Sequence, residues 1–451
     1  MPANARTIAE LARAIRSGEL TAETATRDCL ERIAERNPSI NAYITVLADQ
    51  AVAQAKQADA ELKSGRDRGP LHGVPISLKD IIDLAGVSTT AASKVRHGHL
   101  APHDAPVVAR LREAGAVFLG KTNLHEFAFG TTNEDSAFGL VRHPLDPNRS
   151  PGGSSGGSAA SVLDGMAYAS VGTDTGGSVR IPSAACGLVG LKPSLDDVPT
   201  GGVFPLSKTM DHVGPLCRSV EDAAIVHDAL CGRAVSNGSP RNVNGLRIGV
   251  LRGYFTTPLD PQVAAAFEAT CNALAAAGAE LEEVQIPHAG DIAPIYLHIV
   301  LSEAAALHAK TLDSHAEDYN PNVRLRLEMG RYILAEDYVR ALRGRDVLID
   351  EVDATLARRD ALLLPTLAVP AIRLGALAVK IGSIEEPVRN ITLRLTQLFN
   401  ITGHPAITIP CGATTDGLPI GAQLAGGRNR TGDLLALAAA VESLLRPNLS
   451  L

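Results

Sequence analysis

The sequence predicts an α/β protein built on a large mixed β-sheet that α-helices cover on both faces. Two observations lead to this fold class: short apolar runs alternate with helical patterns from about Leu71 onward, and 45% of the 451 residues are apolar against 20% charged. Because no internal repeat or low-complexity linker divides the chain, we expect a single domain over residues 1–451. Its expected segments are N-terminal helices (1–65), a functional core (66–240), an α/β and helical segment that shapes a pocket (241–400) and the rest of the core (401–451).

The individual elements follow from periodicity and from the residues that start and stop helices. The first sixty residues show helical spacing, with Gly18 as a stop and Thr21 as the cap of a helix that reaches Arg36. Later helices are expected at Val107–Glu113 capped by Asp104, at Ser219–Leu230, from Asp260-Pro261, over much of 300–360 and from Thr431. Buried strands are expected at 116–119, 168–172, 246–251, 362–365 and 406–409.

Charge and cysteine content disfavour several classes of protein. The net charge is −7 and lysines and arginines do not cluster, which is unlike a nucleic-acid-binding protein. Six cysteines without CxxC spacing indicate neither a disulfide scaffold nor a zinc or redox module. The N-terminus lacks a signal-peptide pattern, and we find no stretch of about 18 apolar residues. We therefore expect a cytoplasmic protein without a membrane partner.

Three short motifs match known sites in pattern but not in context. Residues 115–122 fit a phosphate-binding loop, yet the spacer residues themselves form an apolar strand, so we expect a strand end with a surface lysine at Lys121. Residues 153–157 fit a nucleophile elbow, but a turn-forming run precedes them where the elbow needs a strand. The histidines at 97, 99 and 103 lie among glycine and proline, which predicts a solvated loop and no metal site.

Serine and glycine concentrate in two stretches, Ser150–Ala159 and Gly172–Arg180. A flexible linker is one interpretation, but the strand-like run between the stretches argues against it. Two tight turns that present hydroxyls beside free amides fit better. Consecutive amides at Thr175, Gly176, Gly177 and Ser178 would converge on an oxyanion, because glycine lets an oxygen approach the backbone closely.

A serine nucleophile needs a base, and Lys79 is the lysine best placed among the nine in the chain. It ends an apolar, strand-like run that begins at Gly73. An ion pair with Asp80 or with another acid is the alternative interpretation. To act as a base near neutral pH, its pKa must fall from about 10.4 to near 7, which corresponds to roughly 4.6 kcal/mol of desolvation and electrostatics.

The chain resembles the amidase signature family, which includes fatty-acid amide hydrolase, peptide amidase and the glutaminase subunit of glutamyl-tRNA(Gln) amidotransferase. The resemblance covers nearly the whole chain and implies the amidase signature fold. It rests on segments spread from the first third of the chain to its end: Gly73–Asp80, Gly120–Phe127, the two serine/glycine stretches, Gly187–Pro193, Asp211–Pro215, Phe399–Ala406 and Pro410–Gly412.

The resemblance implies a role for each matching residue. Ser178 matches the family nucleophile, Ser154 the serine of a cis peptide that relays protons, and Lys79 the general base. The resemblance also places the oxyanion hole at the amides of residues 175–178, and it implies that Ser155, Asp174 and Arg180 brace the site. No metal or cofactor is implied.

Substrate-binding residues are expected in three regions: the stretch 126–135, the loop after Ser194 and helical residues between about 300 and 400. Phe127, Gly130, Thr131 and Phe204 are the candidates, and ordinary core packing is the alternative for each. The sequence departs from the family pattern at Leu195-Asp-Asp-Val198, where Tyr-Gly-Arg is common. It also has His143 where asparagine is frequent.

Three functions remain open at this point. The first is a stand-alone amidase, a serine hydrolase that acts on a small-molecule carboxamide, aryl amide or carbamate through an acyl-enzyme, with a homodimer as one option for its assembly. The second is the amidotransferase subunit, which works in a complex and delivers ammonia from glutamine. The third is an inactive scaffold or binding protein. The segment Leu398–Pro405 favours the first, and the presence of all three triad residues disfavours the third.

Overall fold

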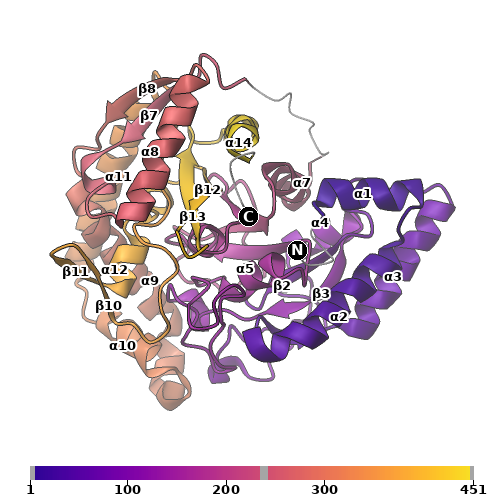
Figure 1. Cartoon of the computed structure of the whole chain (residues 1–451). Coiled ribbons are helices and arrows are strands. Elements are labelled where there is room, and N and C mark those ends of the chain that lie inside the picture. Colours follow the sequence, from indigo (N-terminus) through magenta and orange to yellow (C-terminus); the bar gives the residue numbers. More distant parts are fainter. Residues whose placement is uncertain (1–5, 234–241, 447–451) are drawn as a thin grey trace.

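The computed structural model describes residues 6–233 and 242–446, so the expected segment boundary at 240 and the extreme termini lie outside it. Eleven strands of the described chain form one mixed sheet that crosses the middle of the molecule (Figure 1), which confirms the predicted fold class. The strand order is β1-β3-β2-β4-β6-β5-β12-β13-β9-β7-β8. In chain order these strands are β1 (Tyr43–Val46), β2 (Pro75–Lys79), β3 (Val117–Thr122), β4 (Ala169–Asp174), β5 (Val189–Lys192), β6 (His212–Cys217), β7 (Arg247–Leu251), β8 (Glu280–Val284), β9 (Ala361–Pro365), β12 (Ala406–Ala413) and β13 (Pro419–Ala425). A separate hairpin consists of β10 (Ala378–Ile381) and β11 (Ile384–Pro387).

Helices flank this sheet, with α1–α3 at its N-terminal edge and α9–α11 at the opposite side of the molecule (Figure 1). Their bounds are α1 (Ile8–Ser17), α2 (Ala22–Ile40), α3 (Ala48–Lys63), α4 (Pro106–Glu113), α5 (Gly156–Leu163), α6 (Arg180–Ala185), α7 (Val220–Cys231), α8 (Pro261–Ala276), α9 (Ile292–His315), α10 (Pro321–Gly330), α11 (Ala335–Leu356), α12 (Val388–Leu393), α13 (Gln397–Ile401) and α14 (Thr431–Leu445). The short helices α5 and α6 pack on the central strands β4 and β5, and the two serine-rich stretches lead into these helices.

Most of the expected helix caps are present. The hydroxyls of Thr21 and Ser219 and the carboxylate of Asp260 each accept a backbone N–H at the start of α2, α7 and α8. The expected cap at Asp104 is wrong: α4 begins at a proline, which needs no partner for its nitrogen, and Asp104 pairs with Arg112 instead.

The five strands expected from apolar runs are all present, with bounds that shift by a few residues. The strands without such a run were not predicted, namely β1, β5, β6, β8 and β13 of the sheet and both strands of the hairpin. In β5, β6 and β13, glycine or proline interrupts the run, and both residues are typical of turns. Pairing with neighbouring strands stabilises these segments although their intrinsic strand propensity is low. For example, β6 lies between β4 and β5 in the sheet and is buried along its whole length.

Lys121 lies in the interior and not on the surface as the sequence led us to expect. Its side chain is fully buried, and its Nζ lies 3.0 Å from the equally buried Asp80 Oδ1. Lys121 also donates a hydrogen bond to Thr89 Oγ1 at 3.1 Å. Asp80 therefore pairs with Lys121, which removes the ion pair with Asp80 that was the alternative explanation for Lys79.

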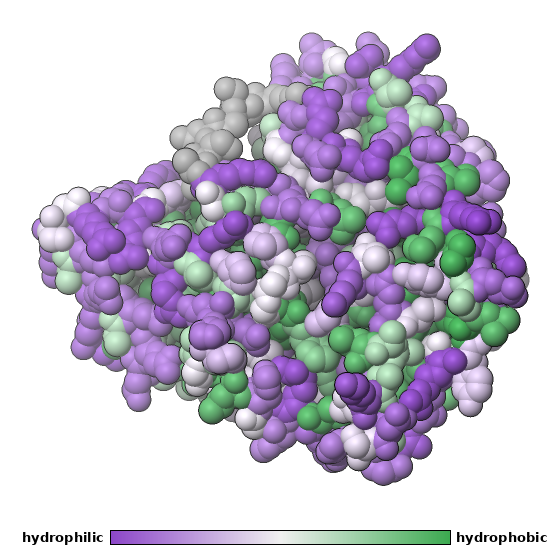
Figure 2. Space-filling view, turned by 180° about the vertical axis from the view of Figure 1, so that it is seen from behind, coloured by the Kyte–Doolittle hydropathy of each residue, from purple (hydrophilic) through white to green (hydrophobic). Residues whose placement is uncertain are grey.

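One apolar helical stretch of the described chain is long enough, by length and composition alone, to cross a membrane. It spans residues 289–318 and includes α9, which corrects our interpretation of the sequence. Half of its most apolar window is buried, and α9 packs against α10, α11 and α13, as a core helix does. From behind, apolar residues gather among hydrophilic ones toward the side of the molecule where α9–α11 lie (Figure 2). The exposed apolar side chains of this region include Leu297, Leu325, Met329, Tyr332 and Leu334.

The Lys121–Asp80 pair predicts a large effect of a single substitution on stability. Lys121→Ala leaves the Asp80 carboxylate buried without its counter-ion, so we expect the free energy of unfolding to fall by about 3–5 kcal/mol in urea denaturation. Arg340→Ala, which removes an exposed pair with Asp337, is the control and should change stability by less than about 1 kcal/mol. Equal, small effects of both substitutions would contradict the assigned role of the buried pair.

Candidate active site

Lys79 ends β2 in the interior of the sheet, between β3 and β4. Its Nζ donates hydrogen bonds to Ser154 Oγ at 2.8 Å and to Thr173 Oγ1 at 2.7 Å. The side chain is fully buried, and this desolvation lowers the pKa of Lys79 to about 7, although the charges of Asp174 and Asp211 act to raise it. At neutral pH a lysine with this pKa is present in both its charged and its neutral form.

Ser154 and Ser155 lie in the turn that leads into α5. The peptide bond between Gly153 and Ser154 is cis, as the family resemblance implies. The Ser154 carbonyl accepts a hydrogen bond from the His125 amide at 3.0 Å, which ties the turn to the loop after β3. The Ser155 amide donates to the Ser178 carbonyl at 3.3 Å, so the two serine-rich stretches meet at this point.

Asp174 organises the second turn, between β4 and α6. Its carboxylate accepts hydrogen bonds from the backbone amides of Gly177 at 2.8 Å and Val179 at 3.1 Å. The chain therefore wraps around this side chain and carries Ser178, which is 5% exposed. Within the described chain, the Ser178 hydroxyl has no hydrogen-bond partner.

A buried charged network holds Asp174 in place. The Arg180 guanidinium donates to both Asp174 oxygens, at 2.9 and 3.1 Å, and to the side-chain oxygens of Asn400 at 2.6 Å and Gln423 at 2.5 Å. Burial alone would raise the pKa of Asp174, but the charge and hydrogen bonds of Arg180, together with the hydrogen bond from Asn400, outweigh burial and hold this pKa well below its usual range. Asp174 is therefore a permanent carboxylate.

Of the four amides expected to form an oxyanion hole, that of Gly177 already donates to Asp174, whereas those of Thr175, Gly176 and Ser178 have no such bond to this carboxylate. Gly177 has a φ of +133°, and a Cβ there would lie 2.3 Å from Thr396 Oγ1. Only glycine fits this position, on both grounds.

A cavity of about 510 Å³ reaches this cluster at Thr173 and Thr175. Phe204, Leu206 and Leu307 contribute apolar walls, and Asp211 lies at its edge. Burial raises the pKa of Asp211 to about 6, although a hydrogen bond from Thr175 opposes the shift. The cavity offers an apolar volume next to a polar edge that contains the hydroxyl partner of Lys79.

The four expected substrate-binding residues differ in their relation to this cavity. Phe204 lines it. Phe127 packs behind Phe204, with ring centroids 5.3 Å apart. Gly130 packs against the His125 ring, and Thr131 Oγ1 accepts a hydrogen bond from Thr392 at 3.0 Å. Phe204 is thus the one of the four that faces the cavity.

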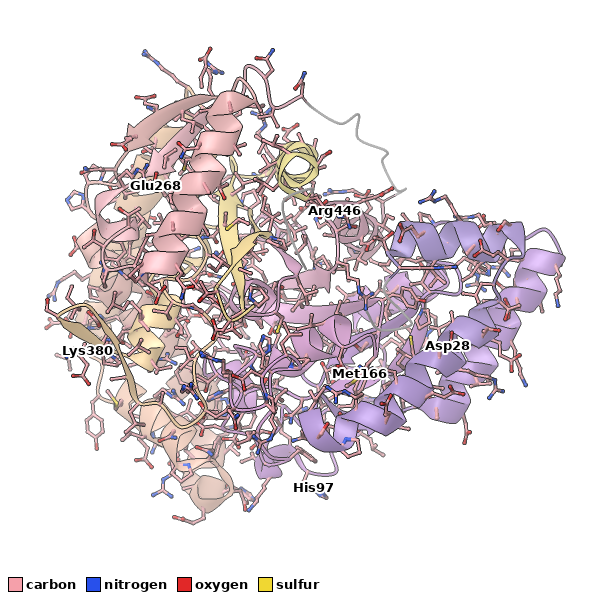
Figure 3. All side chains as sticks on the ribbon, in the orientation of Figure 1. Asp28, His97, Met166, Glu268, Lys380 and Arg446 are labelled. Carbon is pink, nitrogen blue, oxygen red and sulfur yellow. The ribbon has the colours of Figure 1, made fainter. Side chains whose placement is uncertain are left out.

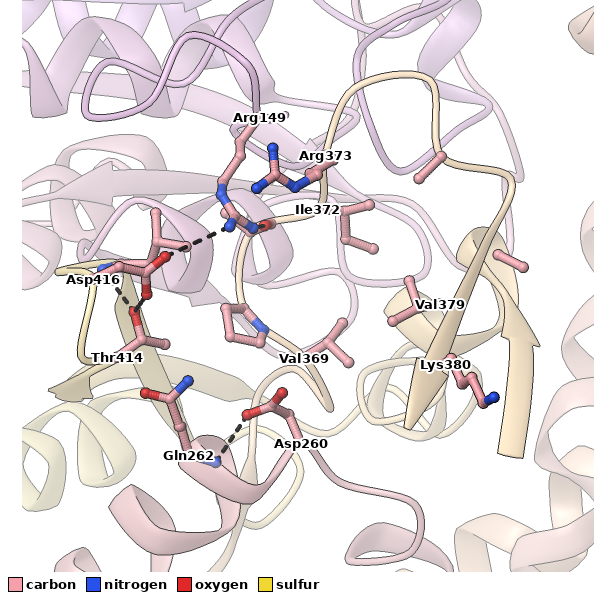
Figure 4. A pocket seen from close by; sticks show the side chains of 15 residues that line it. Arg149, Asp260, Gln262, Val369, Ile372, Arg373, Val379, Lys380, Thr414 and Asp416 are labelled. Carbon is pink, nitrogen blue, oxygen red and sulfur yellow. Dashed lines mark hydrogen bonds and ion pairs between the residues drawn. The ribbon is translucent and has the colours of Figure 1, made fainter. Parts of the chain in front are cut away.

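A second cavity, of about 380 Å³, lies away from this cluster between the 369–379 loop and β10 (Figure 4). Arg149 reaches into it and pairs with Asp416 at 3.6 Å, while Asp260 caps α8 at its rim. None of the expected site residues lines it. It is a surface feature without chemistry linked to the buried lysine.

The structure also shows where four histidines to which we assigned no function lie. His97, His99 and His103 are exposed, and His97 projects from the periphery of the molecule (Figure 3). His143 is buried, with Nε2 2.9 Å from the Ala185 carbonyl and Nδ1 accepting from the Leu145 amide at 3.1 Å. It is a hydrogen-bonded core histidine that supports the end of α6.

Sequence reasoning missed three residues of the site: Thr173, Asp211 and Asn400. Asp211 and Asn400 stand inside motifs that carry the family resemblance, so a signal was present but no role was assigned. Thr173 also stands inside such a motif, the second serine/glycine stretch, but only the fold brings its hydroxyl to Lys79.

Comparison with known proteins decides the family. The Amidase family model matches residues 24–435. This chain belongs to the amidase signature family. It is 42% identical to an amidase of Pseudomonas putida over 428 residues, which covers 91% of this chain and 90% of the relative. It is 38% identical to a glutamyl-tRNA(Gln) amidotransferase subunit of Koribacter versatilis over 486 residues, 99% of each.

Solved structures agree with this assignment. A crystal structure of an amidase superposes with a TM-score of 0.92 at 38% identity and covers 98% of this chain and 100% of its own. The amidase signature fold is thereby confirmed, and the chain is an amidase-family hydrolase that acts on carbon–nitrogen bonds.

The lowered pKa of Lys79 predicts that this buried lysine reduces the free energy of unfolding. In the unfolded chain this lysine titrates near pH ~10.4, so between pH 7 and pH 10 the unfolded state binds one proton more than the folded state. The resulting penalty is largest at and below pH 7, where it is about 4 kcal/mol, and it fades as the pH rises. Removing the lysine removes this penalty but also its two hydrogen bonds, and the loss of these bonds offsets about half of the gain in stability.

Lys79→Met is therefore expected to raise the free energy of unfolding by about 2 kcal/mol at pH 7 and to leave it nearly unchanged at pH 9. Urea denaturation of both proteins at the two pH values measures this difference. Lys56→Met, at an exposed lysine, is the control and should show no pH-dependent difference. A constant Lys79→Met difference at pH 7 and 9 would show that the pKa of Lys79 is not lowered.

Proposed function

We propose that this protein is a stand-alone amidase that cleaves the C–N bond of a small-molecule amide through an acyl-enzyme, with Ser178, Ser154 and Lys79 as its triad. The observation that carries the proposal is the fully buried Lys79, whose pKa is lowered to about 7 and whose Nζ lies 2.8 Å from Ser154 Oγ. Such a lysine is neutral for a large part of the time at pH 7, and only the neutral amine accepts a proton.

The proposed reaction begins with a proton relay. Neutral Lys79 takes the proton of the Ser154 hydroxyl, which takes that of Ser178, and Ser178 Oγ forms a bond to the substrate carbonyl carbon. The amides of Thr175, Gly176 and Ser178 stabilise the resulting oxyanion; the Gly177 amide, expected to join them, instead holds Asp174. Ser155, Asp174 and Arg180 act as positioning residues for this turn.

The relay then runs in reverse. The proton returns through Ser154 to the leaving nitrogen, the C–N bond breaks, and an amine departs. Water, deprotonated by the same relay, attacks the acyl-enzyme and releases the carboxylic acid, which leaves Ser178 and neutral Lys79 as they began. No step of this sequence calls for a metal or a cofactor.

The substrate class follows from the cavity. Its walls at Phe204, Leu206 and Leu307 suit an apolar or aryl group, and its polar lining includes Thr173, whose hydroxyl accepts a hydrogen bond from Lys79. Aryl amides are the proposed substrates. Carbamates, as cleaved by a urethanase, are a variant of the same chemistry.

A second candidate, the glutaminase subunit of the tRNA amidotransferase, is favoured by the 38% identity to the Koribacter versatilis protein over 99% of both chains. Such a subunit works in a complex on glutamine. We favour the stand-alone enzyme because the P. putida amidase has the higher identity, 42% over 91% of this chain. We also propose a cytoplasmic location, since all six cysteines lie in the described chain and none forms a disulfide.

The exposed apolar side chains of α10 and α11 support a homodimer as the form in solution.

The first test is hydrolysis by the isolated chain of a nitroanilide amide, a nitrophenyl carbamate and glutamine. We expect release of nitroaniline, and Ser178→Ala should reduce it by about 10³-fold or more because the nucleophile is lost. Ser183→Ala, at a buried serine one turn along α6, is the matched control and should retain activity. Glutaminase activity without release of nitroaniline would instead support the amidotransferase subunit, and full activity of Ser178→Ala would refute the assignment of Ser178 as the nucleophile.

The pH dependence of kcat/KM tests whether Lys79 is the general base. Because only neutral Lys79 accepts a proton, kcat/KM should rise about tenfold per pH unit below pH 7 and level off above it. Lys79→Ala should lose about 10²- to 10⁴-fold of activity and this dependence with it.

Asp211→Asn distinguishes the titration of Lys79 from that of the nearby acid. The charge of Asp211 raises the pKa of Lys79, so its removal should move the rise slightly toward lower pH and leave its slope intact. Disappearance of the rise in Asp211→Asn would assign the titration to Asp211 and overturn the role of Lys79.

A further inference from the structure

Three side chains with metal-ligating atoms meet outside the active site: Asp197, His227 and Cys231. Their ligand atoms all lie within 4.8 Å of one another. His227 and Cys231 are one turn apart on α7, so both face the same side of that helix. Asp197 comes from the loop after β5, in the segment where the sequence departs from the family pattern. The loop turns there through Asp196, whose φ is +64°.

We propose that Asp197, His227 Nε2 and Cys231 Sγ form a binding site for a Zn²⁺ ion, with water as the fourth ligand. Thiolate, imidazole and carboxylate together form the donor set that zinc prefers among common metals. The sequence predicted no metal site, because the ligands come from two elements 30 residues apart and form no spacing motif.

The distances fit such a site. Asp197 Oδ2 lies 3.0 Å and Cys231 Sγ lies 3.3 Å from His227 Nε2. Tetrahedral zinc holds neighbouring nitrogen, oxygen and sulfur ligands about 3.2–3.6 Å apart, given Zn–ligand distances of about 2.0–2.3 Å. Outward shifts of a few tenths of an ångström therefore make room for the ion.

The histidine ring is oriented as in a metal site. Its side chain is 1% exposed, and Nε2 points at both other ligands while Nδ1 points away. Nδ1 has no hydrogen-bond partner among the described residues, and Asp228 Oδ1 lies 3.9 Å from it. Metal on Nε2 places the ring proton on Nδ1, facing this carboxylate, which is the usual outer partner of a metal-bound histidine.

The charges around the cluster also match. Arg233 donates to Asp197 Oδ1 at 2.6 Å, which holds that oxygen and leaves Oδ2 for the ion. The Cys231 thiol gives up its proton to solvent as the metal binds, so one thiolate and one carboxylate neutralise Zn²⁺. Cys231 and Asp197 are partly exposed, which gives the ion and its water a path to the site.

The test measures metal binding to the full chain directly. After removal of metal with a chelator, we expect dialysis against a slight excess of ZnCl₂ to leave one zinc per chain above the buffer level. Co²⁺ in place of zinc should produce a thiolate-to-cobalt charge-transfer band in the near ultraviolet. Zinc should also raise the thermal unfolding midpoint of the wild-type protein.

Cys231→Ser and His227→Gln should each weaken zinc binding at least tenfold and abolish the cobalt band or the thermal shift. Cys411→Ser is the matched control, because Cys411 is also partly buried but lies on β12, and it should bind zinc like the wild type. The absence of both stoichiometric zinc and the cobalt band in wild-type protein overturns the proposal, even if the substitutions prevent folding. Unchanged binding by folded Cys231→Ser, which would place the metal elsewhere, also overturns it.

Discussion

At the centre of the sheet the Asp174 carboxylate meets the Arg180 guanidinium, and both side chains are fully buried. Two charges leave water here, and the cost is recovered only because every polar atom finds a partner. Arg180 reaches Asn400 on α13 and Gln423 on β13, while Asp174 gathers the amides of its own turn. The pair thereby joins the N-terminal half of the sheet to the C-terminal half, and the turn with Ser178 forms at the junction.

Asp174 also acts on Lys79, the candidate base. A buried lysine beside two acids would ordinarily stay charged, since each carboxylate favours its protonated form. Burial has the largest effect on the pKa of Lys79, and the charges of Asp174 and Asp211 oppose it without outweighing it. Desolvation therefore dominates, and the pKa of Lys79 falls to about 7. The base is produced by burial, against the effect of both neighbouring carboxylates.

A similar principle distinguishes the three buried lysines. Lys121 lies 3.0 Å from a buried carboxylate and stabilises the loop after β2 through that ion pair. Lys192 donates to the Pro193 carbonyl at 2.9 Å, and burial together with the charge of Arg180 lowers its pKa well below the usual value. Only Lys79 combines a lowered pKa with a serine hydroxyl as its partner. Burial alone does not identify a base; the partner atom does.

The sequence by itself determined the fold class, the family and the identity of the triad candidates, because apolar periodicity and dense local motifs are properties of contiguous residues. It did not reveal β6 or β13, whose glycines and prolines imitate turns, nor the burial of Lys121. Contacts between distant segments were decided only by the tertiary structure: Thr173 beside Lys79, Asn400 beside Arg180, and Asp197 beside His227. The physical reason is that desolvation and pairing depend on which strands become neighbours, and neighbouring strands in this sheet are often far apart in the chain.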